Sequence, residues 1–206
     1  TLFTIPPLMK KLQATVFEID GNYVKIAYPL ALWEEGNAVQ LLSGIAGNIF
    51  GMKALRNLRL IDVQLPAAYI RHFKGPHFGN DGIRKMMKVY DRPLTGAVAK
   101  PKIGFSAQEH ADIAYETWMG GFDFVKDDEN LTSTSFNRFE DRVKFMTKLR
   151  EKAIKETGEQ KSAYLNITAD VETMKMRAQL LADNGWNFAM IDVVVAGTAS
   201  VMTMRD

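Results

Sequence analysis

The fold is decided by residues 122–158, which read FDFVKDDENLTSTSFNRFEDRVKFMTKLREKAIKETG. The first residues, Phe122 to Asp127, are rich in aromatic and β-branched side chains and predict a short strand. A helix is predicted from about Phe136 to Glu156, and Gly158 is its expected C-terminal stop. The stretch is therefore one strand–loop–helix unit, with a cluster of charged residues where the strand ends.

The same strand-then-helix order recurs on both sides of this unit. Ser106 and Glu109 form a capping-box pattern, which predicts a helix from there to Met119. The other predicted strands are Leu94–Lys102, Ser162–Thr168 and Asn187–Val195, and the other predicted helices are Val171–Asn184 and one that has begun before Asp206. Four βα units in a row predict a parallel sheet, either doubly wound or part of a (β/α)₈ TIM barrel.

The nucleotide-binding forms of the doubly wound sheet are disfavoured. No Gly-x-Gly-x-x-Gly follows a predicted strand, and the chain has no Gly-Lys-Ser/Thr phosphate loop. Four units make half of a barrel, and half of a barrel leaves sheet edges uncovered. The α/β part is therefore either the first half of a TIM barrel, truncated, or an open α/β sheet.

The residues before this part predict a different, smaller domain. Leu12–Ile19 and Tyr23–Tyr28 flank Asp20-Gly21-Asn22, which is a hairpin signal. Val39 to Leu55 carries apolar residues near the helical period, and Leu58 to Leu65 alternates as a half-buried strand does. We expect a small α+β, ferredoxin-like amino domain over residues 1–88, followed by the α/β part, which is an incomplete barrel or an open sheet, over residues 89–206.

Composition limits the classes of function. The chain has 206 residues, a net charge of +2, no cysteine and three scattered histidines. Thiol catalysis and thiolate metal sites are excluded, no nucleic-acid surface is expected, and a bound metal would meet mainly oxygen ligands. No apolar run is long enough for a membrane span, so a cytoplasmic protein is expected. The absence of an initiator methionine suggests that the chain does not start at its natural beginning.

Two lysines lie at the end of the first barrel strand. Lys100 and Lys102 are two residues apart, so on a strand both ammonium groups project to the same side. Packed together at a barrel mouth, each disfavours the charge of the other, which suits proton transfer. The alternative is an exposed pair that only solvates the strand end.

The second strand ends in Lys126, Asp128 and Glu129. The two carboxylates are placed to supply neighbouring oxygen ligands to a magnesium ion. Lys126 is an awkward neighbour for a metal, and two roles stay open for it. It is either a salt-bridge partner or a neutral amine that adds carbon dioxide and becomes an anionic carbamate ligand.

Four motifs together resemble a known family. Phe124 to Asn130 is similar to the magnesium-site motif of ribulose-1,5-bisphosphate carboxylase/oxygenase large chains. Gly96 to Gly104 resembles the first barrel strand of that family, Gly47 to Leu55 its amino-domain helix motif, and Tyr164 to Thr168 its third strand. The four fall in the order of the family and at about its spacings.

The resemblance implies a role for each site residue. Lys126 would be the carbamylated lysine, and Asp128 and Glu129 would complete the protein ligands to Mg²⁺. The carbamate would also take the proton from C3 of the substrate. Lys100 would protonate the final carbanion, with Lys102 beside it, and Asn48 would contact substrate in the active site of a partner subunit.

The resemblance also implies the reaction and the partners. The substrates would be ribulose-1,5-bisphosphate with CO2 or O2, and the product of carboxylation would be two molecules of 3-phosphoglycerate. The active site would be shared between subunits of a homodimer or higher homo-oligomer. Details such as Arg92 to Gly96 favour the archaeal-type form III or II/III branches, for which no small subunit is expected.

Two other functions stay open. One is a carboxylase-like protein acting as a 2,3-diketo-5-methylthiopentyl-1-phosphate enolase in methionine salvage, although Asn48 together with Asn130 disfavours it. The other is a truncated, non-catalytic assembly partner of full-length subunits. The remaining active-site segments of the family would lie beyond residue 206, so we expect no carboxylase activity from this chain by itself.

Overall fold

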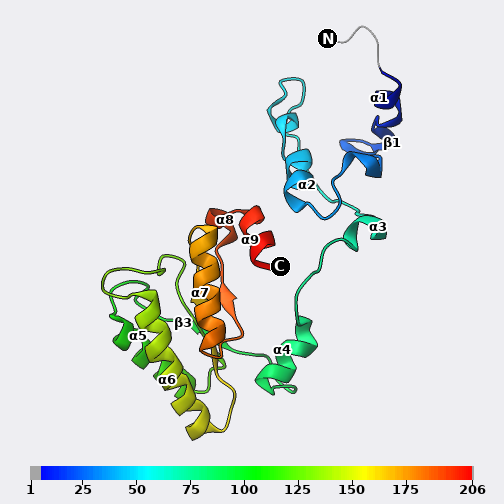
Figure 1. The fold of residues 1–206 in the computed structure, drawn as a ribbon. Coiled ribbons are helices and arrows are strands. Elements are labelled where there is room, and N and C mark those ends of the chain that lie inside the picture. Colours follow the sequence, from blue (N-terminus) through cyan, green and yellow to red (C-terminus); the bar gives the residue numbers. More distant parts are fainter. Residues whose placement is uncertain (1–5, 206) are drawn as a thin grey trace. The chain divides into compact units, whose positions relative to one another are not determined.

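The computed structural model describes residues 6–205, apart from the side chains of residues 48 and 49. The chain forms two compact units, one up to Gly75 and one from Pro76 onward, and each is described by itself. Figure 1 gives the helices and strands of both units. The predicted domain boundary after residue 88 stays a prediction.

The first unit contains the predicted hairpin. After the short helix α1 (Pro7–Lys11), β1 (Thr15–Asp20) and β2 (Tyr23–Ala27) pair antiparallel, with Asp20 opposite Tyr23. Gly21 has a φ of 55° in the two-residue turn, a conformation that favours glycine. The hairpin prediction is thus confirmed.

The rest of the first unit consists of short helices joined by irregular segments. These helices are η1 (Leu30–Leu32), α2 (Ala38–Ile45), η2 (Asn48–Gly51) and α3 (Ala67–Ile70). Asn37 caps α2, because its side chain accepts hydrogen bonds from the backbone N–H groups of Val39 and Gln40, each at 3.0 Å. The helical pattern predicted over Val39 to Leu55 is therefore divided between α2 and η2.

The strand predicted over Leu58 to Leu65 is wrong. These residues pair with no strand in the described part of the chain, and Leu60 and Ile61 are 52% and 72% exposed. Alternation describes a face that a strand can bury, but a strand also needs a neighbouring backbone to receive its hydrogen bonds. Here the segment runs without such a partner.

The second unit is built on a four-stranded parallel sheet in the order β3-β4-β5-β6. Its strands are β3 (Gly96–Val98), β4 (Phe124–Lys126), β5 (Ser162–Asn166) and β6 (Ala189–Met190). Its helices are α4 (Gly79–Met87), α5 (Ala107–Met119), α6 (Phe139–Thr157), α7 (Val171–Asp183), α8 (Val193–Ala196) and α9 (Thr198–Arg205). The mixed α/β class with a parallel sheet is as predicted.

Two helix ends lie where local signals predicted them, whereas α6 begins at Phe139 and not at the predicted Phe136. Ser106 and Glu109 form the reciprocal capping box of α5, in which the backbone N–H of Ser106 donates to Glu109 at 2.8 Å. Gly158 ends α6 with a φ of 72°. Both signals are local, so neither depends on the rest of the fold.

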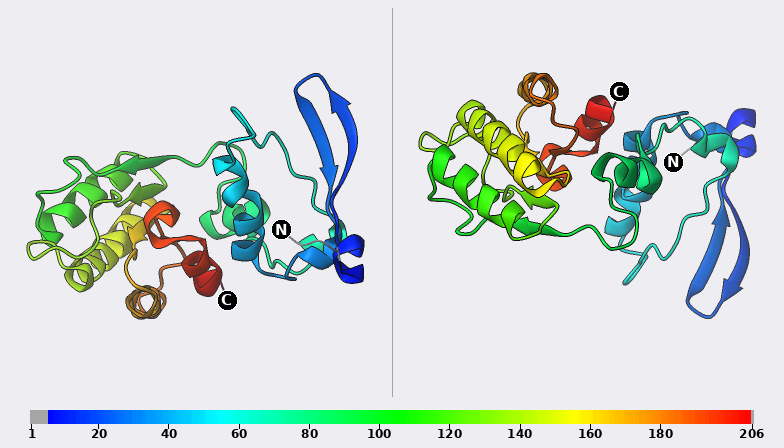
Figure 2. Two further views of the ribbon diagram at one scale, coloured as in Figure 1. Left: turned by 90° about the horizontal axis from the view of Figure 1, so that it is seen from above. Right: turned by 90° about the horizontal axis from the view of Figure 1, so that it is seen from below.

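The core of this unit lies between the sheet and helices α5 to α7. α5 and α6 pack side by side, as both views of Figure 2 show. Their buried side chains meet the outward residues of the strands in one cluster, whose members include Trp118, Phe139, Met146, Leu165 and Met174. This packing fixes the strands, and hence the loops that follow them.

The fourth predicted strand is correct only at its centre. Only Ala189 and Met190 pair with β5, whereas Val193–Ala196 forms the short helix α8. Asp192 is the reason, because its Oδ1 accepts a hydrogen bond from the N–H of Val194 at 3.0 Å and caps that helix. The valine run is therefore helical, although valine favours strands. None of the helices in residues 6–205 is long and apolar enough to cross a membrane.

Candidate metal and carbamate site

The site is built at the carboxyl end of β4. Along this strand Phe124 and Lys126 face one side and Val125 and Asp127 the other. The ring of Phe124 stacks on Tyr164 at 4.8 Å and meets Phe188 edge-on at 5.2 Å, so this side carries an aromatic layer. Val125 belongs to the helix-covered core. The strand therefore points Lys126 away from the helices, toward the side that is the interior of a TM barrel.

The predicted site residues come together as two ion pairs. Nζ of Lys126 lies 2.6 Å from Oε1 of Glu129 and also donates to the carbonyl oxygen of Asp127 at 3.0 Å. Nζ of Lys100 lies 3.0 Å from Oδ2 of Asp128. The ends of β3 and β4 are thus joined across the mouth of the sheet by opposite charges.

These charges keep both carboxylates ionised. Burial raises the pKa of Asp128, but the hydrogen bond from Lys100, the N–H of Asn130 and the positive charges of Lys100 and Lys102 outweigh it, so the pKa lies below its ordinary value. The hydrogen bond from Lys126 lowers the pKa of Glu129. Both groups are therefore anionic, as metal ligands must be, at neutral pH.

Exposure differs sharply between the members of the site. The side chain of Asp128 is 5% exposed, that of Lys126 30%, and those of Glu129 and Lys100 54% and 62%. Asp128 is thus held in place, whereas Glu129 and the two lysines remain accessible to solvent and able to exchange partners.

Lys100 and Lys102 lie in the loop after β3 and not on the strand. β3 ends at Val98, two residues before Lys100, so the strand alternation used to place both ammonium groups on one side does not apply. Lys100 nevertheless reaches Asp128, and the charge of Lys102 acts on the same carboxylate. The loop therefore brings both lysines to the site by a different route from the one predicted.

Asn48, the predicted substrate-contacting residue, belongs to the first unit. Its backbone is part of η2, and its side chain lies outside the described residues. Its role therefore stays a prediction.

A buried polar network supports the turn and was not foreseen from the sequence. Asp127, 1% exposed, accepts hydrogen bonds from Nε of Arg142 at 3.1 Å, from Nε2 of His110 at 3.0 Å and from the backbone N–H of Asn166 at 2.9 Å. Burial raises the pKa of Asp127, but the charge of Arg142 and the hydrogen bond from His110 dominate and lower it. Asp127 is thus an ionised anchor.

Arg142 extends the network to the loops around the site. It is fully buried on α6 and donates to the carbonyl of Thr132 at 2.7 Å and to Oδ1 of Asn137 at 2.8 Å. Asn137 in turn donates to the carbonyl of Phe105, in the loop that follows β3, at 3.1 Å. One buried cation therefore links the loop after β4 to the loop after β3.

One sequence signal pointed to this network. Arg142 falls among the buried, mostly apolar positions of α6, together with Phe139, Val143 and Met146. A charged residue at such a position requires a buried partner. Asp127, which strand alternation turns away from Lys126, was the available acid.

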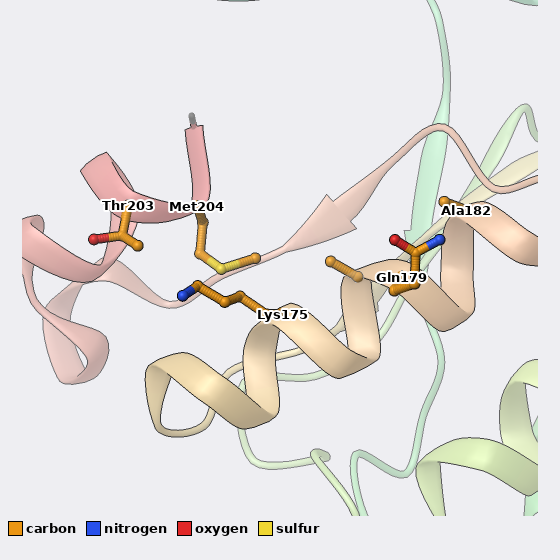
Figure 3. Close-up of a pocket in the computed structure, with 6 residues that line it drawn as sticks. Lys175, Gln179, Ala182, Thr203 and Met204 are labelled. Carbon is orange, nitrogen blue, oxygen red and sulfur yellow. The ribbon is translucent and has the colours of Figure 1, made fainter.

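A groove in the second unit lies away from this site. A cavity of about 370 Å³ lies between α7 and α9 and is lined by Lys175, Ala178, Gln179, Ala182, Thr203 and Met204. Figure 3 shows Lys175 and Gln179 on one wall and Met204 on the other. None of the predicted site residues lines it, and Lys175, its one charged residue, is paired with Glu172 at 3.0 Å. It adds nothing to the chemistry at β4.

The donor set at β4 fits a magnesium ion if Lys126 carries a carbamate. No group of three histidine, cysteine, aspartate or glutamate side chains that could hold a metal occurs within the described ranges. Asp128 and Glu129 supply two carboxylates, and each is paired with a lysine at present. A carbamate on Lys126 would add a third oxygen ligand and remove the competing cation, giving the all-oxygen set that Mg²⁺ prefers.

Comparisons with known proteins identify the family of the chain. Residues 1–69 match the family described as ribulose bisphosphate carboxylase large chain, N-terminal domain, and residues 80–206 match the catalytic domain of that chain. A ribulose bisphosphate carboxylase of Pyrococcus abyssi is 53% identical over 210 residues, which cover 100% of this chain and 50% of the relative. One from Methanocaldococcus jannaschii is 47% identical over 97% of this chain and 49% of its own length.

Solved structures give the same result. The octameric enzyme of Pyrococcus horikoshii OT3 superposes with a TM-score of 0.96 at 52% identity, over 100% of this chain and 50% of that one. A dimeric archaeal Rubisco from Hyperthermus butylicus gives 0.94 at 43% identity, over 100% and 49%. The chain thus spans about half the length of the relatives it matches. It belongs to the ribulose bisphosphate carboxylase large-chain family, covering its amino-terminal domain and the first part of its catalytic domain.

Proposed function

We propose that the protein containing this chain is a magnesium-dependent ribulose-1,5-bisphosphate carboxylase that adds CO2 to its sugar substrate and yields two molecules of 3-phosphoglycerate. The observation that carries the proposal is the convergence of Lys126, Asp128 and Glu129 at the end of β4, with Lys100 bonded to Asp128. The 53% identity to a protein named ribulose bisphosphate carboxylase favours this reaction over the enolase of methionine salvage.

Formation of a carbamate on Lys126 would change the charges of the site. Lys126 as an ammonium ion pairs with Glu129 at 2.6 Å. Addition of CO2 requires the neutral amine, so the ammonium ion first loses one proton to solvent. The amine nitrogen then bonds to the carbon of CO2, a second proton leaves the nitrogen to solvent, and an anionic carbamate remains. The site then changes by two charges, from a lysine cation between two carboxylates to three anions.

Three anions at one strand end repel each other unless a cation joins them. Carbamate formation and divalent-metal binding are therefore expected to stabilise each other. Magnesium, when bound, polarises substrate oxygens and holds the reacting groups together. The carbamate of Lys126, Asp128 and Glu129 would be its protein ligands, and the N–H of Asn130, which donates to Asp128 at 3.2 Å, fixes one of them.

The side chains of this chain then have separate tasks in proton transfer. A carbamate on Lys126 would take the proton from C3 of the substrate, which would permit attack on CO2 or, as the side reaction, on O2. Once Asp128 is bound to metal, Lys100 loses its ion-pair partner and becomes available to donate a proton to the final carbanion. Lys102 places a second positive charge beside it and offsets negative charge that develops in the reaction.

The same comparisons support a homo-oligomeric assembly. The structures of the Pyrococcus horikoshii and Hyperthermus butylicus proteins are described as octameric and dimeric. We propose a homo-oligomer of large chains without a small subunit, located in the cytoplasm. Asn48 would contact the substrate in the site of a neighbouring copy.

The proposal is tested on the full-length protein that contains this chain. Purified protein is incubated with Mg²⁺, ¹⁴C-bicarbonate and ribulose-1,5-bisphosphate, and acid-stable radioactivity in 3-phosphoglycerate is measured. Product that requires both the metal and bicarbonate pre-incubation is expected. A correctly folded oligomer that forms no labelled 3-phosphoglycerate would contradict the proposal, and enolisation of the methylthio-diketone phosphate would then favour the enolase.

A further inference from the structure

Asn166, the last residue of β5, contacts three consecutive residues of the turn that carries the carboxylates. Its side-chain Nδ2 donates to the carbonyl oxygen of Asp128 at 3.3 Å and to that of Glu129 at 3.1 Å. Its backbone N–H donates to Oδ2 of Asp127 at 2.9 Å. The residue is completely buried, so no water replaces these bonds.

Asn166 is itself held in one orientation. Its Oδ1 accepts a hydrogen bond from the N–H of Thr168 at 3.0 Å, which directs the amide nitrogen toward the turn. Its backbone is fixed by the pairing of β5 with β6, where it lies opposite Met190. The amide is thus a rigid donor of two hydrogen bonds.

We propose that Asn166 is a positioning residue for the metal ligands Asp128 and Glu129, an inference that rests on the proposed function. A hydrogen bond to a backbone carbonyl fixes the plane of that peptide, and each plane sets the direction from which the next side chain leaves the backbone. Two fixed carbonyls in succession therefore limit the positions that the carboxylates of the turn can take.

The chemistry of the amide suits this task. Two neighbouring carbonyl oxygens need two N–H donors, and one amide nitrogen carries both. An aspartate in its place would set carboxylate oxygens against those carbonyls and beside Asp127. A threonine has a similar volume but a single hydroxyl donor on a shorter side chain.

The second support of the turn acts on Asp127, from α5 and α6. Arg142 and His110 hold its carboxylate at 3.1 Å and 3.0 Å, both from fully packed positions. The turn is therefore pinned through its backbone by β5 and through Asp127 by two helices. Residues behind the ligands that hold them in place typically contribute 10–100-fold to metal affinity.

The test measures metal binding rather than activity. Full-length protein in saturating bicarbonate is titrated with Mn²⁺, and free Mn²⁺ is followed by electron paramagnetic resonance for wild type, Asn166→Ala and Asn166→Thr. Asn184→Ala is the matched control. Asn184 lies in the loop between α7 and β6, and its Nδ2 also donates to a backbone carbonyl, that of Leu180, at 2.8 Å. That loop lies at the edge where the strands begin, away from the ligands.

We expect the Kd for Mn²⁺ to rise about 10–100-fold in Asn166→Ala, less in Asn166→Thr, and less than twofold in Asn184→Ala. The carbamate resonance from ¹³C-bicarbonate should weaken in parallel. Wild-type affinity in both folded Asn166 variants would overturn the inference while leaving the proposed function standing. Failure of both variants to fold would also overturn it, because Asn166 would then be needed for the fold itself. A wild-type protein that binds no Mn²⁺ would instead refute the proposed function.

Discussion

Nζ of Lys126 lies 2.6 Å from Oε1 of Glu129, three residues further along the same turn. The residue expected to carry the carbamate is thus bonded, in its unmodified form, to one of the ligands that the carbamate would join. Nζ of Lys100 stands in the same relation to Asp128, at 3.0 Å. Both carboxylates are paired with lysines, and a metal bound as proposed would take the place of these lysines.

Glu129→Gln should weaken metal binding with little change in stability. The substitution keeps the size of the side chain and removes the charge that a divalent ion requires. We expect the Kd for Mn²⁺ in bicarbonate to rise by about 10-fold or more. Glu172→Gln is the control, because Glu172 forms an equivalent pair with Lys175 three residues along α7. An equal loss of affinity in both variants would show that Glu129 is no ligand.

Lys100→Met should lower the rate of carboxylation without weakening metal binding. Metal and carbamate binding should persist, because Lys100 is no ligand, whereas carboxylation should fall by about 10²–10⁴-fold through loss of the proton donor. The same change removes the main cause that lowers the pKa of Asp128, so that pKa should rise toward its ordinary value. The rate of labelled 3-phosphoglycerate formation is compared with Mn²⁺ affinity. A variant that keeps wild-type turnover would exclude Lys100 from proton transfer.

Arg142→Met should destabilise the second unit strongly. The change leaves the carboxylate of Asp127 buried without its cation, for which a cost on the order of 3–5 kcal/mol is typical. Adding Asp127→Asn to the same chain should restore part of the loss, because the buried charge is then gone. Thermal melting of the full-length protein measures both. Additive losses in the double variant would mean that the two side chains do not depend on each other.

Acid should destabilise the fold through Asp123. The guanidinium of Arg92 donates to both oxygens of this carboxylate, at 2.7 and 2.8 Å, and the N–H of Thr95 donates at 2.7 Å. Burial raises the pKa of Asp123, but these bonds outweigh burial and lower the pKa below its ordinary value. A carboxylate with a lowered folded pKa contributes stability that is present above its unfolded value and is lost as pH falls through the folded one.

The melting temperature should therefore decline below about pH 4, and Asp123→Asn should reduce that decline. At pH 7 the variant should melt lower than wild type, and the difference should shrink toward pH 3. Melting curves between pH 3 and pH 7 measure it. A difference that stays constant over this range would show that ionisation of Asp123 does not stabilise the fold.

The parts of the fold that were predictable are those set by local chemistry. The capping box at Ser106 and the left-handed Gly158 determine helix ends with residues close in sequence, and both are as predicted. The strand predictions for Leu58 to Leu65 and for the valines after Asp192 are wrong for the same reason. The state of these residues depends on whether a strand partner or a cap is available, which alternation and propensity do not state.

The candidate site shows the same division. Lys126, Asp128 and Glu129 were predictable as a cluster, since they are nearly adjacent in sequence and sit at one strand end. The residues that hold this cluster in place were not predictable. Asn166 lies 37 positions from Glu129 in the sequence, and the side chains that hold Asp127 come from two helices. Only the folded chain selects these partners.

The central claim is that Lys126 becomes a carbamate that binds magnesium with Asp128 and Glu129. The most direct measurement is ¹³C NMR of the full-length protein in ¹³C-bicarbonate with Mg²⁺, compared with Lys126→Arg, which keeps the cation beside Glu129 but does not form the carbamate. We predict one carbamate resonance per chain in wild type that disappears in Lys126→Arg and weakens when Mg²⁺ is chelated. A wild-type protein without that resonance, or a resonance that persists in Lys126→Arg, would contradict the account.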